Sequence, residues 1–247
     1  MESSTLISLW KESLGLLHWS TSKLLFLASL NTFVRATKLI VKYFWWLTIA
    51  IIAFNIGALY KGTGLFHQAA LYGSIILLDI YFFYFLLAVR PSVENKDFCY
   101  FFRYYPALIV FMLSALPYAF NVSNSPITSL LCSLIGHLIF ICMNYSTFFF
   151  LDSDLSLNAL IPSIKRGFLL VWSFFPGIII FNLIIFSISI VFSFIVGLLG
   201  TLLVYSLNLN VSVLGLIAAL ITSGLHAALT SVLYTKIKHS HFSLFFE

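Results

Sequence analysis

The sequence predicts an all-α polytopic membrane protein with six transmembrane helices and with amphipathic helices at the cytoplasmic membrane surface. Of its 247 residues, 61% are hydrophobic and only 9% are charged, and the mean hydropathy is +1.06. Soluble domains carry about 25% charged residues and expose few large apolar patches. We therefore expect most of this chain to be surrounded by lipid.

Ionisable residues and turn residues divide the chain into apolar stretches, and a helix needs about 20 such residues to cross a bilayer. The expected spans are residues 39–60, 66–89, 106–122, 127–151, 167–194 and 211–234. They form one membrane domain at 38–235, which follows a cytoplasmic amphipathic segment at 1–37 and precedes a cytoplasmic tail at 236–247.

The last two spans come from one long uncharged region. Residues 167–235 contain no Lys, Arg, Asp or Glu, and they are too long for a single span. Gly197, Gly200 and the Asn-Leu-Asn at 208–210 indicate breaks in this region, and Pro176-Gly177 indicates a break within the fifth span. We expect residues 195–210 to lie at the outer interface or to enter the membrane partway.

The basic residues predict the orientation of the chain. Six spans place twelve Lys and Arg residues on one side of the membrane and only Lys61 on the other. Such an asymmetry is typical of a cytoplasmic side rich in positive charge. Both termini are therefore expected in the cytoplasm, and a seventh span would export Lys236 and Lys238.

The sequence contains one internal repeat. Aligned without gaps, residues 29–56 and 156–183 are identical at nine of 28 positions, including Ser-Leu-Asn, a following Lys and a Trp. Each copy begins with one stripe at helical spacing, which is typical of an amphipathic helix leading into a span. The stripes are Leu30, Phe33, Val34, Thr37 and Val41, and Leu157, Leu160, Ile161, Ile164 and Phe168. The repeat indicates either a decayed parallel duplication or two copies of one insertion motif.

The basic residues beside these stripes are expected to contact lipid headgroups, which would explain the net charge of +5. They are Arg35, Lys38, Lys42, Lys165 and Arg166. No loop is large enough to form the basic face that a nucleic acid would need. The expected partners are membrane lipids, and beyond them other membrane proteins or a second copy of the chain.

Several features together resemble a known group of proteins. They are two Ser-Leu-Asn-x6-Lys segments that lead into Trp-bearing spans, six spans, and a final helix ending in HAALTSVLYTKIKHS. They resemble the uncharacterised six-span bacterial inner-membrane proteins grouped with the membrane domain of glycerophosphodiester phosphodiesterases, over about residues 25–238. The resemblance implies the bacterial inner membrane as the location. It implies no chemistry, because that membrane unit has none established and this chain carries no phosphodiesterase domain.

Polar residues within the predicted spans are the candidates for a functional site. Asp79 is the only carboxylate inside a span, where an acid costs about 2.5–3.5 kcal/mol on insertion scales. It is interpreted either as a proton or ion relay with His137 or His226, or as a structural hydrogen-bonding group. Asn55 and Asn182 occupy equivalent positions of the repeat and are expected to bond between helices.

The sequence contains no recognisable catalytic motif, and we expect no catalytic residue, bound metal or cofactor. Asp152 and Asp154 are expected to cap the helix that follows them. The favoured function is a non-enzymatic membrane scaffold or accessory protein. The alternatives are a small transporter or channel that uses Asp79 with His137 and His226, and a lipid enzyme that uses Asp79 with His226.

Overall fold

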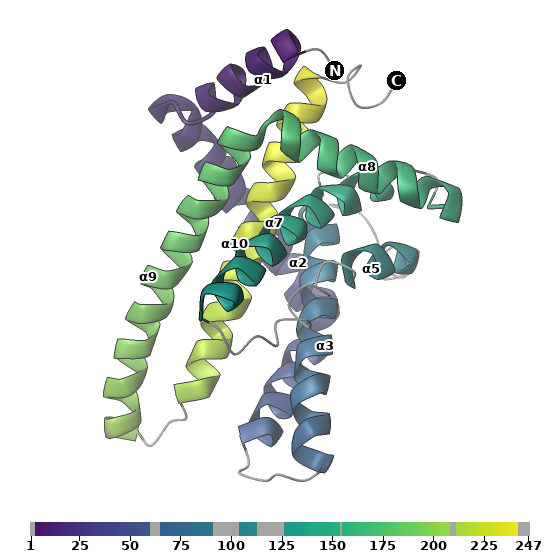
Figure 1. Cartoon of the computed structure of the whole chain (residues 1–247). Helices are drawn as coiled ribbons and strands as arrows, with labels where there is room; N and C mark the ends of the chain where they lie inside the picture. The colour runs from purple at the N-terminus through teal and green to yellow at the C-terminus, as the bar shows by residue number, and fades with distance from the viewer. Residues whose placement is uncertain are drawn as a thin grey trace. The chain divides into compact units, whose positions relative to one another are not determined.

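The structure is a computed structural model that describes residues 3–59, 65–90, 104–112, 126–153, 155–207 and 211–241 (Figure 1). All regular elements in these ranges are α-helices. The chain divides into two compact units. The first comprises Met1–Leu25, Asn95–Ile179 and Thr230–Glu247, and the second comprises Phe26–Glu94 and Ile180–Leu229.

The described helices differ widely in length. They are α1 (Ser3–Gly15), α2 (Trp19–Leu59), α3 (Leu65–Ala88), α5 (Tyr105–Met112), α7 (Pro126–Leu151), α8 (Leu157–Ser173), α9 (Phe175–Leu207) and α10 (Val211–Ser240). Within the described residues, Ser20–Phe54 and Leu134–Leu151 are long and apolar enough to cross a membrane, and the bent pair α8–α9 makes a third candidate. The all-helical class is therefore confirmed, and the count of six spans stays a prediction.

Two predicted spans coincide with single helices. The stretches 66–89 and 127–151 correspond to α3 and α7, because each is a long apolar run that follows turn-forming residues. The stretch 106–122 begins within α5, and its residues from 113 onward lie outside the described part of the chain.

The first predicted span does not begin as a separate helix. The amphipathic segment and the span are joined in α2, which is interrupted by non-helical backbone at Phe44 (φ −127°, ψ 21°). The side chain of Phe44 is fully buried. Helix α2 thus consists of two helical parts that meet at a buried aromatic residue.

The fifth predicted span, 167–194, is divided between two helices, and its predicted break at Pro176-Gly177 is wrong in position by two residues. Its first residues belong to α8, and the chain turns by 89° before α9 begins. The turn is at Phe174, whose backbone (φ −113°, ψ 24°) closely matches that of Phe44. Pro176 lies in the first turn of α9, where a helix does not need the missing N–H group.

The predicted break after residue 194 is also wrong. Helix α9 continues to Leu207 through Gly197 and Gly200. A glycine costs a helix about 1 kcal/mol relative to alanine. Leaving the helix would break backbone hydrogen bonds, and each backbone group left unsatisfied away from water costs several kcal/mol. The continuous helix therefore has the lower free energy. Residues 208–210 lie outside the described part of the chain.

The first unit is organised around the second half of α7, where residues 141–151 are buried on every side. Helix α8 packs closely along α7 through small residues, as helices do in membranes. The hydroxyl of Ser146 donates to the carbonyl oxygens of Cys142 (2.8 Å) and of Ile164 on α8 (3.3 Å). A Cβ atom at Gly167 would lie 2.7 Å from the Cα of Ser146, so only glycine allows this approach.

Helix α1 contacts the corner between α8 and α9. The indole N–H of Trp10 donates to the carbonyl oxygen of Trp172 at 2.9 Å, and the two rings meet edge to face at 6.2 Å. The backbone N–H of Gly177 donates to the hydroxyl of Ser13 at 3.2 Å. The hydroxyl of Ser13 and the indole of Trp10 therefore supply hydrogen bonds to backbone groups at the turn between the two helices.

The second unit has a similar centre at the end of α3, where residues 81–89 are buried. Tyr84 of α3 stacks on Phe44 of α2 with ring centroids 4.4 Å apart, and Phe85 contacts Phe33 at 5.7 Å. A Cβ atom at Gly224 of α10 would lie 2.9 Å from the ring of Phe85. Helices α2, α3 and α10 thus pack together around aromatic side chains.

Candidate functional site

Asp79 and His226 lie on two helices that pack against each other in the second unit. His226 of α10 contacts the ring of Phe82 of α3 at 6.4 Å between centroids. Phe82 follows Asp79 by three residues, which is about one helical turn. Asp79 is half-buried and makes no hydrogen bond or ion pair with another described residue. The structure thus brings the two helices together without a direct bond between the two side chains.

The other predicted intramembrane residues are described by their own surroundings. His137 is half-buried on α7, in the first unit, and lies 6.3 Å from the ring of Phe140 on the same helix. Asn182 is buried on α9 and takes part in the packing there. Asn55 is in α2, and its side chain lies outside the described part of the structure. A relay that includes all three titratable residues stays a prediction.

The residues expected to meet lipid headgroups lie on α2 and α8, and they differ in their surroundings. Lys38, Lys42 and Lys165 are exposed, and the ammonium group of Lys42 lies 4.8 Å from the ring centroid of Tyr43. Arg166 is half-buried. Arg35 is half-buried too, and its guanidinium donates to the carbonyl oxygen of Val89 at 3.0 Å. Arg35 therefore caps the C-terminal end of α3, where a cation is favoured.

Both predicted stripes are largely exposed. In the first copy Leu30, Val34 and Val41 are exposed, and in the second copy Leu157 is 85% and Ile161 is 63% exposed. Phe33 of the first stripe is half-buried and packs on Phe85, whereas on α8 the buried residues Ser163 and Gly167 lie off the stripe. Most of each stripe thus faces outward, as an interfacial helix requires.

Sequence reasoning missed an acidic contact that joins α7 to α10 in the first unit. Asp152 accepts hydrogen bonds from the hydroxyl of Tyr234 (2.7 Å) and from the ammonium group of Lys238 (2.6 Å). It does not cap α8, because Ser156 does so by accepting from the N–H of Ala159 at 3.3 Å. Asp154 lies outside the described residues. No sequence pattern marks this contact, because its members come from distant parts of the chain.

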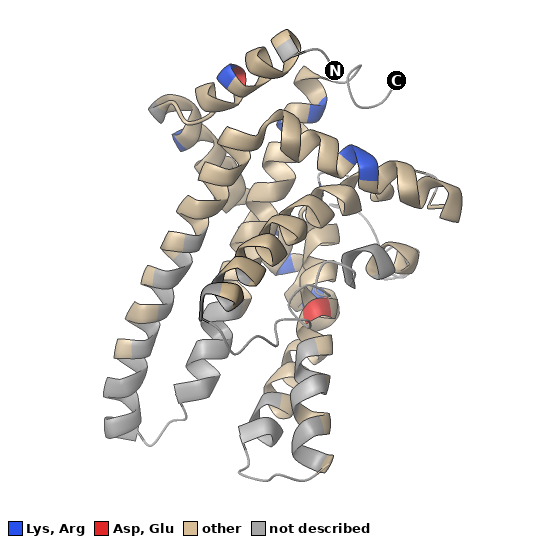
Figure 2. Ribbon diagram, in the orientation of Figure 1, with Lys and Arg blue, Asp and Glu red and all other residues tan. Residues whose placement is uncertain are grey.

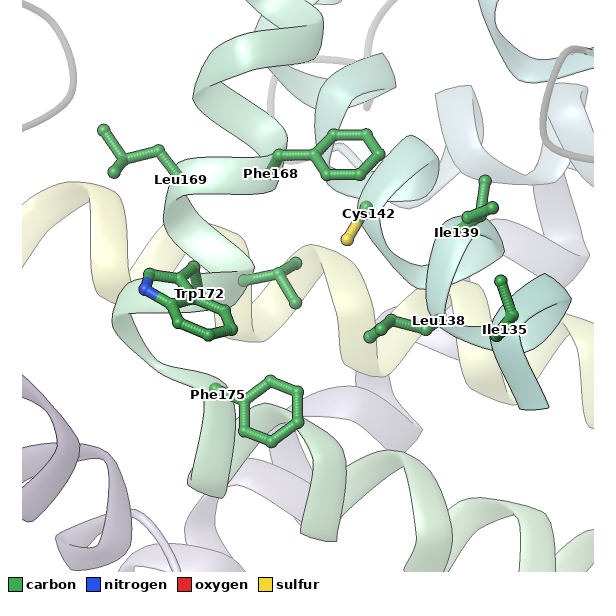
Figure 3. Close-up of a pocket in the computed structure, with 9 residues that line it drawn as sticks. Ile135, Leu138, Ile139, Cys142, Phe168, Leu169, Trp172 and Phe175 are labelled. Atoms are coloured by element: carbon green, nitrogen blue, oxygen red, sulfur yellow. The ribbon is translucent and has the colours of Figure 1, made fainter. Parts of the chain in front are cut away.

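A groove of about 460 Å³ opens between α7, α8 and the start of α9 in the first unit (Figure 3). Its lining is almost entirely apolar, and side chains of α7 lie opposite Trp172 and Phe175. The lining residues are Ile135, Leu138, Ile139, Cys142, Phe168, Leu169, Val171, Trp172 and Phe175. This volume lies within the range of about 300–1,000 Å³ that is usual for small-molecule pockets.

In the part of the chain that the structure describes, no three His, Cys, Asp or Glu side chains are grouped so that they could hold a metal ion. Comparisons of the chain with family models, with curated proteins and with solved structures found no match.

Proposed function

We propose that this protein is a non-enzymatic scaffold or accessory protein of a bacterial inner membrane, with six spans and both termini in the cytoplasm. The observation that carries the proposal is the surface of α9. This helix has 33 residues and no charged side chain, and its exposed residues include Leu183, Val191, Phe194 and Leu198 (Figure 2). A helix that exposes such residues needs hydrocarbon around it.

The two repeat copies support the same placement. Each consists of a helix with an exposed apolar stripe and neighbouring basic residues, followed by a buried aromatic break and a second apolar helix. This order suits a segment that lies on the cytoplasmic membrane surface and then enters the hydrocarbon. The resemblance of the sequence to six-span inner-membrane proteins supports the same topology.

Transport is the second candidate function, and one observation favours it. His226 contacts Phe82, which follows Asp79 by three residues on α3, so one helix pair carries both an acid and an imidazole. Intramembrane acids and histidines are recurrent elements of proton pathways. The exposed apolar surface of α9 supports the scaffold, which therefore stays the favoured function.

Two measurements distinguish these functions. Purified protein is placed in liposomes that contain a pH-sensitive dye, and proton flux is compared with that of Asp79→Asn. The scaffold predicts equal flux in both, and a flux that needs Asp79 would establish transport instead. Extraction of native membranes in detergent-free polymer discs should yield the 27.9 kDa chain within a larger assembly of defined composition. Recovery of the bare monomer would refute the scaffold role.

A further inference from the structure

The groove between α7, α8 and the start of α9 is suited to a long apolar ligand. On α7 the lining residues Ile135, Leu138, Ile139 and Cys142 follow the spacing i, i+3, i+4 and i+7, so they form one face of the helix. Leu138 is 38% exposed, which shows that the groove opens to the outside. A helix that exposes such a face in a membrane presents it to lipid chains.

The face of α8 that lines the groove also carries a positive charge. Lys165, Phe168, Leu169 and Trp172 follow the same i, i+3, i+4 and i+7 spacing, and all four are exposed. Lys165 therefore lies one turn before the first apolar lining residue of this helix. Figure 2 shows the basic turn of α8, which also contains Arg166.

We infer that this groove binds one acyl chain of an anionic phospholipid, whose phosphate is held by Lys165. The inference deepens the proposed membrane function and rests on it. An acyl chain is surrounded by hydrocarbon in the groove and in the bilayer alike, so apolar contact gives little preference for one lipid over another. The charge of Lys165 selects the headgroup, and the wall opposite Trp172 and Phe175 holds the chain.

The fluorescence of Trp172 reports lipid binding in the groove directly, because brominated lipid chains quench the fluorescence only of indoles that they contact. The full chain is prepared with its other four tryptophans replaced by phenylalanine. It is placed in phosphatidylcholine discs that contain a small, equal fraction of brominated phosphatidylglycerol or of brominated phosphatidylcholine. We expect phosphatidylglycerol to bind about fivefold better, which equals the roughly 1 kcal/mol of one basic side chain at an anionic surface.

Matched lysine variants identify the source of this preference. Lys165→Gln should abolish it, whereas Lys236→Gln, which removes an exposed charge on α10, should retain it. A preference that survives Lys165→Gln overturns the inference. Equal quenching by both lipids also overturns it but leaves the protein in the membrane. If neither lipid quenches Trp172, this face of α8 is not in lipid, and the proposed membrane placement fails as well.

A second pair of variants separates occupancy of the groove from general attraction to the lysine. Leu138→Phe fills the groove without changing charge, and Leu134→Phe makes the same change at an exposed position of α7 outside the groove. Native mass spectrometry of the otherwise unaltered chain, released from mixed phosphatidylglycerol and phosphatidylcholine micelles, counts the retained lipid. Phosphatidylglycerol should be lost with Leu138→Phe and kept with Leu134→Phe. Equal retention by the two variants contradicts binding in the groove.

Discussion

Replacing Gly167 by alanine tests the contact that holds α8 against α7. The added Cβ atom would lie 2.7 Å from the Cα and 2.5 Å from the backbone N of Ser146, whereas non-bonded carbons prefer about 3.5–4.0 Å. The two helices must therefore separate by about 1 Å. Overpacking typically lowers the free energy of unfolding by about 1–3 kcal/mol. Here the clashing atoms belong to the backbone and cannot move away by a change of rotamer, so we expect a loss of about 3 kcal/mol.

Alanine also favours the helix by about 1 kcal/mol over glycine, so the expected net loss is about 2 kcal/mol. A change of 1 kcal/mol shifts the Tm of a chain of this size by about 2–4 °C, which predicts a decrease of about 4–8 °C. The assay is thermal unfolding of the purified protein in one detergent.

Gly15→Ala serves as the matched control, because a Cβ atom at Gly15 meets no other atom within 4 Å. Its Tm should stay the same or rise slightly. Ser146→Ala should rescue Gly167→Ala only in part, since it removes the hydroxyl and leaves the backbone atoms in place. An unchanged Tm for Gly167→Ala, or full rescue by Ser146→Ala, would refute the close helix contact.

Three further substitutions test other contacts by the same unfolding assay. Asp152→Ala should lower the free energy of unfolding by about 1–2 kcal/mol, because it removes the acceptor of two hydrogen bonds from α10. Equal stability of Asp152→Ala and Asp152→Asn would contradict this role. Trp10→Phe keeps an aromatic ring but loses the hydrogen bond to the carbonyl of Trp172, so the free energy of unfolding should fall by about 1 kcal/mol. An unchanged free energy of unfolding would show that the hydrogen bond contributes nothing. Asp79→Leu should raise the Tm by about 2–4 °C, since it replaces a half-buried acid without a described partner. Large decreases of the Tm in both Asp79→Leu and Asp79→Asn would instead identify a structural hydrogen bond.

Helix positions were predictable where one strong rule applied. Helices α3 and α7 begin within one residue of their predicted spans, because long apolar runs after turn residues leave few alternatives. The break before α9 was harder to locate. Pro176 indicates it, yet a proline is accepted in the first turn of a helix, so the actual break lies two residues earlier at Phe174.

The contacts that build the sites depend on which faces of which helices meet, and one sequence does not contain that information. Gly167 and Ser163 are spaced as small residues often are at a helix contact, so this face of α8 was open to prediction. The opposite wall of the groove on α7 was not. Likewise, titratable residues within predicted spans suggested Asp79 and His226, but only the packing of α3 on α10 shows that their helices meet.

The paired backbone breaks at Phe44 and Phe174 have a consequence for how this protein fits bilayers of different thickness. A span matches a thinner or thicker hydrocarbon layer mainly by changing its tilt. If each surface helix and its span were one rigid rod, a change of tilt would lift the surface helix out of the headgroups. In the proposed membrane placement, a break between them lets the span change its tilt while the basic helix stays parallel to the membrane surface. Each repeated element would then keep its basic helix at constant depth in bilayers of different thickness.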